Sequence, residues 1–107
     1  MKLWIDDQLA EHDMFARHTP KGWVGAKTVL QACRLIKSGT VTDINFDHDL
    51  GTCWNERGGY IVAKYIEKLA YFKKIPKMNW RIHSANPTGA KNIKRAMESA
   101  ERFWNSE

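Results

Sequence analysis

The sequence predicts a single α/β domain in which helices pack against a parallel β-sheet. The chain has 107 residues, which is the length of one small domain. Short apolar strand patterns alternate with longer helical patterns, as in parallel sheets whose strands are joined by helical crossovers. Three of the strand patterns also end in carboxylates or histidines. The carboxyl ends of parallel strands meet at one edge, so these groups are expected to form one site there.

The first strand pattern covers residues 2–6 and contains three consecutive apolar residues, Leu3, Trp4 and Ile5, as expected of a central strand covered on both faces. Residues 8–21 predict only a short helix before a turn at residues 19–22, where Pro and Gly occur together. Residues 23–26 predict a second, short strand.

The next two elements are better defined. Thr28 followed by Gln31 has the spacing of a capping box, and apolar residues then recur at helical spacing until Ser38 and Gly39 end the helix. Residues 43–48 predict the third strand, which has apolar residues at Ile44 and Phe46 and ends in Asp47-His48.

The last third of the chain predicts two more helices and one strand. Gly58-Gly59 opens a helix that Pro76 stops. Residues 79–84 alternate between apolar and polar residues, which suits an edge strand with one solvated face. Asn86-Pro87 is a helix start, and the apolar stripe of that helix continues to Trp104.

These patterns also predict the order of the strands. The runs at residues 3–6 and 43–47 are the most apolar and are placed in the centre, whereas residues 79–84 are placed at an edge. We therefore expect a sheet of about four parallel strands in the order 2-1-3-4, with helices on both faces.

Composition limits the class of protein. With 43% hydrophobic residues and five Trp, the chain can form a packed core and is not a disordered tail. It contains no apolar run of the roughly 20 residues that a membrane span needs, and no secretory signal is recognised. Cys33 and Cys53 have neither metal-ligand spacing nor a disulfide framework. We expect a reduced, cytoplasmic protein.

The net charge is +5, from 17 basic and 12 acidic residues. Four of the acidic residues belong to the candidate site, so the remainder carries 17 basic against 8 acidic residues, or +9. A basic body around an acidic pocket favours an anionic partner, such as a nucleotide, an RNA end or a phosphate ester. Ordinary solubilising charge is the alternative explanation.

The carboxylates at the predicted strand ends suit a hard divalent cation. Asp6 and Asp7 follow the first strand, and Asp47 and Asp49 flank the end of the third. Carboxylate oxygens with some retained waters are what Mg²⁺ prefers, and Mn²⁺ accepts the same ligands. The alternative is that these residues only cap the segments that follow.

Two histidines follow adjacent strands of the predicted sheet, His48 and His83. Imidazole has an unperturbed pKa near 6.5, so a histidine pair across a phosphate can act as general base and acid. They could instead be ligands of Mn²⁺, Zn²⁺ or Fe²⁺. Ser84 lies beside a helix start, where hydroxyls and free amides bind anions.

Three motifs in order resemble the cyclic-phosphate processing receiver domains, a compact branch of the receiver fold. They are residues 1–7 (MKLWIDD), 47–51 (DHDLG) and 81–87 (RIHSANP). The resemblance implies that Asp6 and Asp7 match the acidic metal-binding pair of receivers. Asp47 would match the phosphoacceptor position, and Ser84-Ala85 the hydroxyl-plus-small pair on the fourth strand.

The sequence also departs from ordinary receivers. They have a fifth strand that carries a Lys and a fifth helix, whereas this chain ends after the helix that carries Trp104. His48 and His83 have no counterpart in ordinary receivers. These departures argue against a phosphorelay role, and the resemblance implies action on cyclic phosphates at RNA ends or in cyclic nucleotides.

Two functions are therefore expected. In the first, Asp6, Asp7 and Asp47 hold a divalent metal, His48 and His83 move protons, and Ser84 holds a phosphate oxygen of a phosphorylated small molecule or RNA end. In the second, the domain is a non-enzymatic receiver-like module that binds a protein or RNA partner. The basic residues of that face would be Lys91, Lys94 and Arg95.

Overall fold

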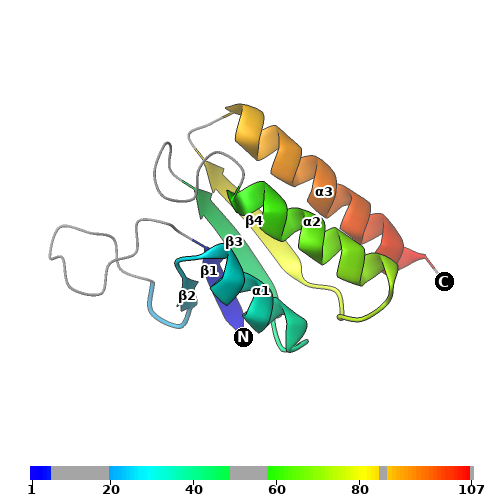
Figure 1. Cartoon of the computed structure of the whole chain (residues 1–107), viewed down its shortest axis with the longest axis horizontal. Helices are drawn as coiled ribbons and strands as arrows, with labels where there is room; N and C mark the ends of the chain where they lie inside the picture. The colour runs from blue at the N-terminus through cyan, green and yellow to red at the C-terminus, as the bar shows by residue number, and fades with distance from the viewer. Residues whose placement is uncertain (6–19, 49–57, 85–86, 107) are drawn as a thin grey trace, which may run out of the picture.

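The computed structural model of the chain contains the predicted parallel sheet. It describes residues 1–5, 20–48, 58–84 and 87–106, with Asp47, His48, Gly58, Ser84, Pro87 and Thr88 described by their backbone alone. All strand pairs are parallel, and the order β2-β1-β3-β4 confirms the predicted order 2-1-3-4 (Figure 1). The strands are β1 (Lys2–Ile5), β2 (Val24–Ala26), β3 (Asp43–His48) and β4 (Asn79–Ser84).

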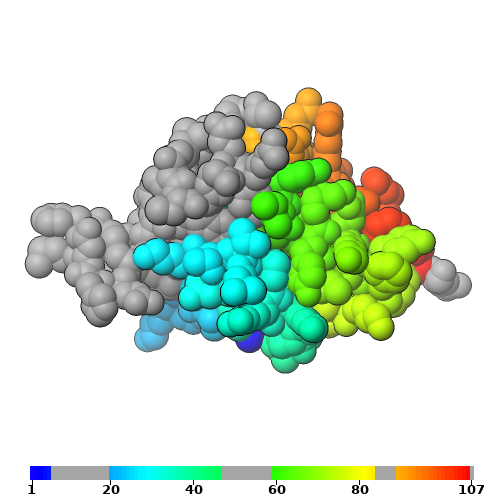
Figure 2. Space-filling model, in the orientation of Figure 1, coloured from blue at the N-terminus to red at the C-terminus, as the bar shows by residue number. Residues whose placement is uncertain are grey.

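Three helices follow the second, third and fourth strands: α1 (Val29–Lys37), α2 (Gly58–Tyr71) and α3 (Pro87–Asn105). They cover the same face of the sheet, and α1 and α2 lie side by side over it (Figures 1 and 2). Handedness explains this arrangement. The connections from β2 to β3 and from β3 to β4 step in the same direction across the sheet, so right-handed crossovers place both helices on one side.

The expectation of helices on both faces rests on the connection from β1 to β2, which steps in the opposite direction. Residues 6–19 of this connection, including most of the short helix predicted within 8–21, lie outside the described residues. The helix layer on the second face therefore stays a prediction. None of the three described helices supplies it.

The core lies between the sheet and its helices. Alternate strand residues point into it, because successive side chains of a strand face opposite sides of the sheet. Leu3, Ile5, Ile44 and Phe46 are each at most 2% exposed. They pack against buried residues of the three helices, namely Ile36, Val62, Ile66, Ile93 and Met97.

Gly59 allows α2 to approach α3 closely. It is buried, and a Cβ added there would lie 2.9 Å from Cδ1 of Ile93 and 3.9 Å from Cδ1 of Phe46. A side chain at this position would therefore require the end of the Ile93 side chain to shift.

The predicted cap of α1 is present. The Thr28 side chain accepts a hydrogen bond of 3.1 Å from the backbone N–H of Gln31. The Gln31 side chain in turn accepts from the backbone N–H of Lys27 at 2.9 Å, one residue before the position of a standard capping box. At the other end, Gly39 has a φ of 76°, the left-handed conformation that glycine adopts without cost.

Two large apolar residues, one in α2 and one directly after it, are exposed. Ile61 is 47% exposed and Phe72 is 54% exposed, whereas Ala63 and Ala70 are fully buried. The helix ends at Tyr71, and Phe72 lies beyond it in an edge-to-face pair with the Tyr71 ring at 5.0 Å. Small residues line the buried face because α2 packs between two neighbouring helices and the sheet.

Asp43 begins β3 with a carboxylate held by two donors. The Thr42 hydroxyl donates to it at 2.8 Å, and the Asn79 amide donates at 3.2 Å from the paired position of β4. These hydrogen bonds lower the pKa of the Asp43 carboxyl. Because the folded-state pKa lies below the unfolded-state value, the associated stability is present at neutral pH and is lost as the pH falls through the lowered pKa.

We therefore expect Asp43→Asn to destabilise the protein at neutral pH. The difference in unfolding free energy between parent and variant should shrink as the pH falls below about 4, where the carboxyl of the unfolded parent takes up a proton, and should vanish once the folded parent is protonated at its lowered pKa. Urea unfolding at a series of pH values measures this difference. A difference that is independent of pH would show that the ionised carboxylate contributes nothing.

Candidate functional site

The candidate site lies at the carboxyl edge of the sheet, where the register brings the ends of three strands together. Ile5, the last residue of β1, pairs with Phe46 of β3, so the chain leaves β1 beside the position of Asp47. On the other side, Asp47 pairs with His83 and His48 pairs with Ser84. Four of the predicted catalytic and metal-binding residues thus occupy two adjacent register positions.

For six of the seven predicted site residues, the structure describes no side chain. Asp6, Asp7 and Asp49 lie outside the described residues, and for Asp47, His48 and Ser84 only the backbone is described. Among the described side chains, no three His, Cys, Asp or Glu residues cluster closely enough to hold a metal. The metal ligands and the orientation of His48 therefore stay predictions.

His83 is the predicted site residue whose side chain is described. It is exposed, and its Nδ1 lies 2.9 Å from Oδ1 of Asn45 on the neighbouring strand. A carbonyl oxygen only accepts hydrogen bonds, so Nδ1 carries the proton and donates. In the neutral ring Nε2 is then the basic nitrogen, available to accept a proton or bind a metal.

Asn45 is a residue of the candidate site that the sequence analysis did not identify. It is 3% exposed and is the one buried polar side chain among the described residues. Burying an amide is costly without hydrogen-bond partners, and the bond to His83 offsets part of that cost. The signal was in the sequence, because Asn45 interrupts the apolar run between Ile44 and Phe46.

The sheet face opposite the described helices carries polar and aromatic residues in register. From the amino to the carboxyl end, one row holds Lys2, Asp43 and Asn79, the next holds Trp4, Asn45 and Arg81, and the last holds Asp47 and His83. A groove of about 460 Å³ lies on this face. We call it the sheet groove, and the residues of these rows that line it are Lys2, Trp4, Asp43, Asn45, Asn79, Arg81 and His83, with Trp23 beside them.

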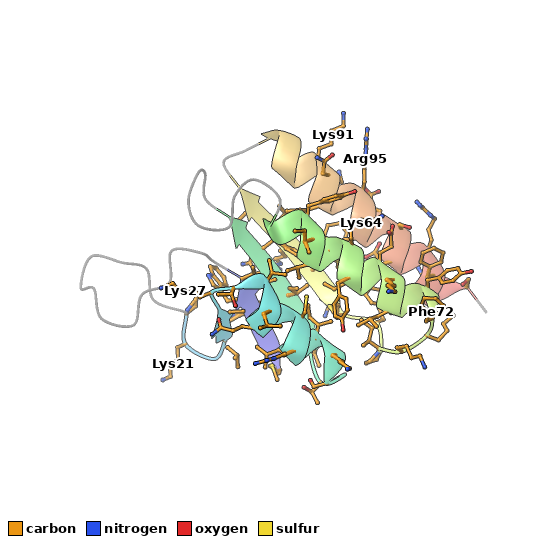
Figure 3. The ribbon with its side chains drawn as sticks, viewed as in Figure 1. Lys21, Lys27, Lys64, Phe72, Lys91 and Arg95 are labelled. Carbon is orange, nitrogen blue, oxygen red and sulfur yellow. The ribbon has the colours of Figure 1, made fainter. Side chains whose placement is uncertain are left out.

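The basic residues named for a partner surface lie on α3, on the far side of the helix layer. Lys91, Lys94 and Arg95 are all exposed, and Lys91 and Arg95 extend outward from the helix in Figure 3. Arg95 also lines a pocket of about 260 Å³ between α2 and α3. The pocket is lined as well by the ion pair of Lys64 and Glu67.

None of the described helices is long and apolar enough to cross a membrane.

Comparison with known proteins gave one family. No curated protein and no solved structure matched the chain significantly. The sequence model of the cyclic-phosphate processing receiver domain matches residues 1–99, which contain the whole sheet and the carboxyl edge described above. The chain therefore belongs to the family of cyclic-phosphate processing receiver domains.

Proposed function

We propose that this protein hydrolyses a cyclic phosphate with the help of a divalent metal at the carboxyl edge of its sheet. The family links the chain to cyclic-phosphate processing. The observation that carries the more specific proposal is the adjacency of Asp47, His48, His83 and Ser84 in the register of β3 and β4, together with the exposed His83 ring held by Asn45. The proposed metal ligand Asp47 and the proposed proton-transfer residues His48 and His83 therefore lie at one edge of the sheet.

In the proposed reaction, a water oxygen bonds to phosphorus and one ester bond of the ring breaks, giving a phosphomonoester with a free hydroxyl. Asp6, Asp7, Asp47 and Asp49 supply the carboxylates for Mg²⁺ or Mn²⁺. When bound, the metal polarises a phosphoryl oxygen or lowers the pKa of a bound water.

The histidines and the serine have separate roles in this proposal. His83 uses Nε2 to take the proton of the attacking water, because its Nδ1 already donates to Asn45. His48 returns a proton to the leaving oxygen, and the hydroxyl of Ser84 donates a hydrogen bond to a phosphate oxygen.

The activity test is a screen of 2′,3′-cyclic mononucleotides and cyclic dinucleotides with Mg²⁺ and Mn²⁺, followed by phosphomonoester release. We expect turnover of at least one substrate, its loss with a chelator, and its loss in Asp47→Asn. If the parent turns over no cyclic phosphate with any metal, the hydrolase proposal is wrong. The receiver-like module, with Lys91, Lys94 and Arg95 as its exposed basic face, then becomes the better account.

Metal binding can be measured without a substrate. A cation that binds only the native state raises the melting temperature, by about 5 °C for a domain of this size when the metal is tenfold above its Kd. Asp47→Asn should abolish the rise. Asp43→Asn is the matched control, because it removes a carboxylate from the opposite end of the same strand and should leave the rise intact. Equal rises in the parent and Asp47→Asn would rule out Asp47 as a ligand.

A further inference from the structure

The sheet groove combines three kinds of side chain that single-stranded nucleic acid requires. The tryptophans Trp4 and Trp23 offer rings for bases, Lys2 and Arg81 offer charge for phosphates, and the amides of Asn45 and Asn79 offer hydrogen bonds. None of the three described helices covers this face, which is turned away from the viewer in Figures 1 and 3. The groove also ends at His83, so it leads directly to the candidate site.

The aromatic part of the groove lies on β1 and at the entry to β2. The rings of Trp4 and Trp23 meet edge to face, with centroids 5.6 Å apart and an angle of 78° between their planes. Both side chains are half-buried, so part of each ring faces the groove. Nζ of Lys2 lies 5.7 Å from the centroid of the Trp23 ring, which places a cation beside the aromatic surface.

The charges in the groove favour an anion. Lys2 and Arg81 are exposed cations, and Arg81 makes no ion pair with any described side chain. The opposing charge is Asp43, whose carboxylate oxygens accept from Thr42 and Asn79. The two cations also lie in successive rows, Lys2 in the first and Arg81 in the second. A ligand with negative charges spaced along its length can contact both.

We propose that the sheet groove binds the last nucleotides of a single-stranded RNA whose cyclic phosphate lies at the carboxyl edge. This inference rests on the proposed function and names its substrate class as an RNA end. Successive rows are two residues apart along a strand, so the row of Lys2 lies about 13 Å from the row of Asp47 and His83. Bound in this way, the RNA runs with its 3′ end toward the carboxyl ends of the strands.

Sheet faces with exposed aromatic residues are an established way to bind single-stranded RNA, because unpaired bases stack on the rings while cations contact the backbone. A cyclic mononucleotide at the carboxyl edge would leave the row of Lys2 and the ring of Trp23 without a contact. The length of the groove therefore favours a chain of nucleotides over a single one.

The test is fluorescence anisotropy of a 5′-fluorescein-labelled hexauridylate that ends in a 3′-hydroxyl, in the presence of a chelator. Neither metal nor a cyclic phosphate is present, so binding is measured apart from chemistry. We expect the hexamer to bind at least tenfold more tightly than a labelled dimer. Two contacted phosphates predict that log Kd rises with log salt concentration with a slope of about 1.4.

Two variants test the groove, each with a matched control. Trp23→Ala should weaken binding about tenfold, the usual scale for a lost stacking surface. Arg81→Glu should weaken it at least as much and lower the salt slope by about 0.7. The controls are Phe72→Ala and Arg34→Glu, which change exposed residues on the helical side. Far-ultraviolet circular dichroism and the melting temperature check that each variant is folded.

The outcomes separate this inference from the proposed function. If the hexamer does not bind, if folded Trp23→Ala and Arg81→Glu bind like the parent, or if the dimer binds as tightly as the hexamer, the groove does not bind an RNA strand. A cyclic dinucleotide that binds this groove more tightly than the hexamer would likewise overturn it. If RNA binds through the groove but no cyclic phosphate is opened with any metal, the groove proposal stands and the hydrolase proposal fails.

Discussion

Replacing His83 by alanine should lower the rate of cyclic-phosphate hydrolysis by about a hundredfold or more. That is the usual scale for the loss of a general acid or base. In the proposed reaction His83 accepts a proton through Nε2, because Nδ1 donates to Asn45. The measurement is kcat on a cyclic phosphate that the parent turns over, taken across a range of pH. The parent should give a bell-shaped profile, and His83→Ala should lose one limb of it.

Asn45 offers a more specific test, because it acts through His83. Asn45→Asp places a carboxylate next to Nδ1, and a carboxylate stabilises the imidazolium form. The acid limb of the pH–rate profile should therefore move to higher pH, whereas damage to folding alone would lower the rate equally at every pH. Lys94→Ala, on the exposed side of α3, is the control and should change kcat by less than about twofold.

Two results would contradict these roles. If His83→Ala loses the metal-dependent rise in melting temperature, His83 is a metal ligand and the base must be another group. If His83→Ala keeps full activity, the His83 ring takes no part in catalysis. Its hydrogen bond to Asn45 then serves only to provide a partner for a buried amide.

Phe46→Ala should have the largest effect on stability, about 3–5 kcal/mol. Phe46 is fully buried in the central strand β3 and lies beneath α2, close to Gly59. Its removal loses the transfer free energy of the ring and leaves a cavity that neighbours held by three helices cannot close. A domain of this size typically has only about 5–15 kcal/mol of stability, so a large part of it would be lost.

Phe72→Ala is the matched control for this substitution. The same side chain is removed, but Phe72 is 54% exposed and contributes mainly its edge-to-face pair with Tyr71. We expect a loss of about 1 kcal/mol or less. Urea unfolding of both variants with an unchanged m value gives the comparison. Equal losses would mean that the core around Phe46 does not hold the sheet and helices together.

The order of the strands was predictable because the hydropathy pattern that distinguishes a central strand from an edge strand can be read within each strand's own sequence. The apolar run at residues 3–5 and the apolar Ile44 and Phe46 on either side of Asn45 mark the two central strands, and the alternation in residues 79–84 marks an edge. The run at residues 3–5 also predicted cover on both faces. Leu3 and Ile5 are buried on the side of the described helices, and Trp4, which turns toward the sheet groove, is half-buried, so cover of that second face stays a prediction.

The burial of α2 was harder to predict. Its apolar residues occur on several sides of the helix, so hydropathy alone does not separate the exposed Ile61 from the buried Val62 and Ile66. The buried positions include Ala63 and Ala70, which have small side chains and therefore give a weak signal. Which side is buried is decided by the neighbours of α2 on both sides, α1 and α3, and these contacts are long-range.

The candidate site was predictable in position but not in detail. The carboxylates and histidines follow apolar runs, and parallel pairing then brings the strand ends together. The bond between Asn45 and His83 joins residues that are 38 positions apart and depends on the exact register of β3 and β4. The sheet groove could not be predicted for the same reason, because its rows combine residues from three strands and depend on their register.

Every strand after β2 adds to the same side of the sheet, in the order in which a ribosome delivers it. β3 joins β1, β4 joins β3, and the helix that covers each junction is made between or directly after them. The sheet can therefore grow during synthesis by one strand and one helix at a time, without waiting for a strand made later to insert between earlier ones. Among the described strands, β4 forms the outer edge on this side, and its exposed Arg81 adds a charge that disfavours pairing with a strand of another chain.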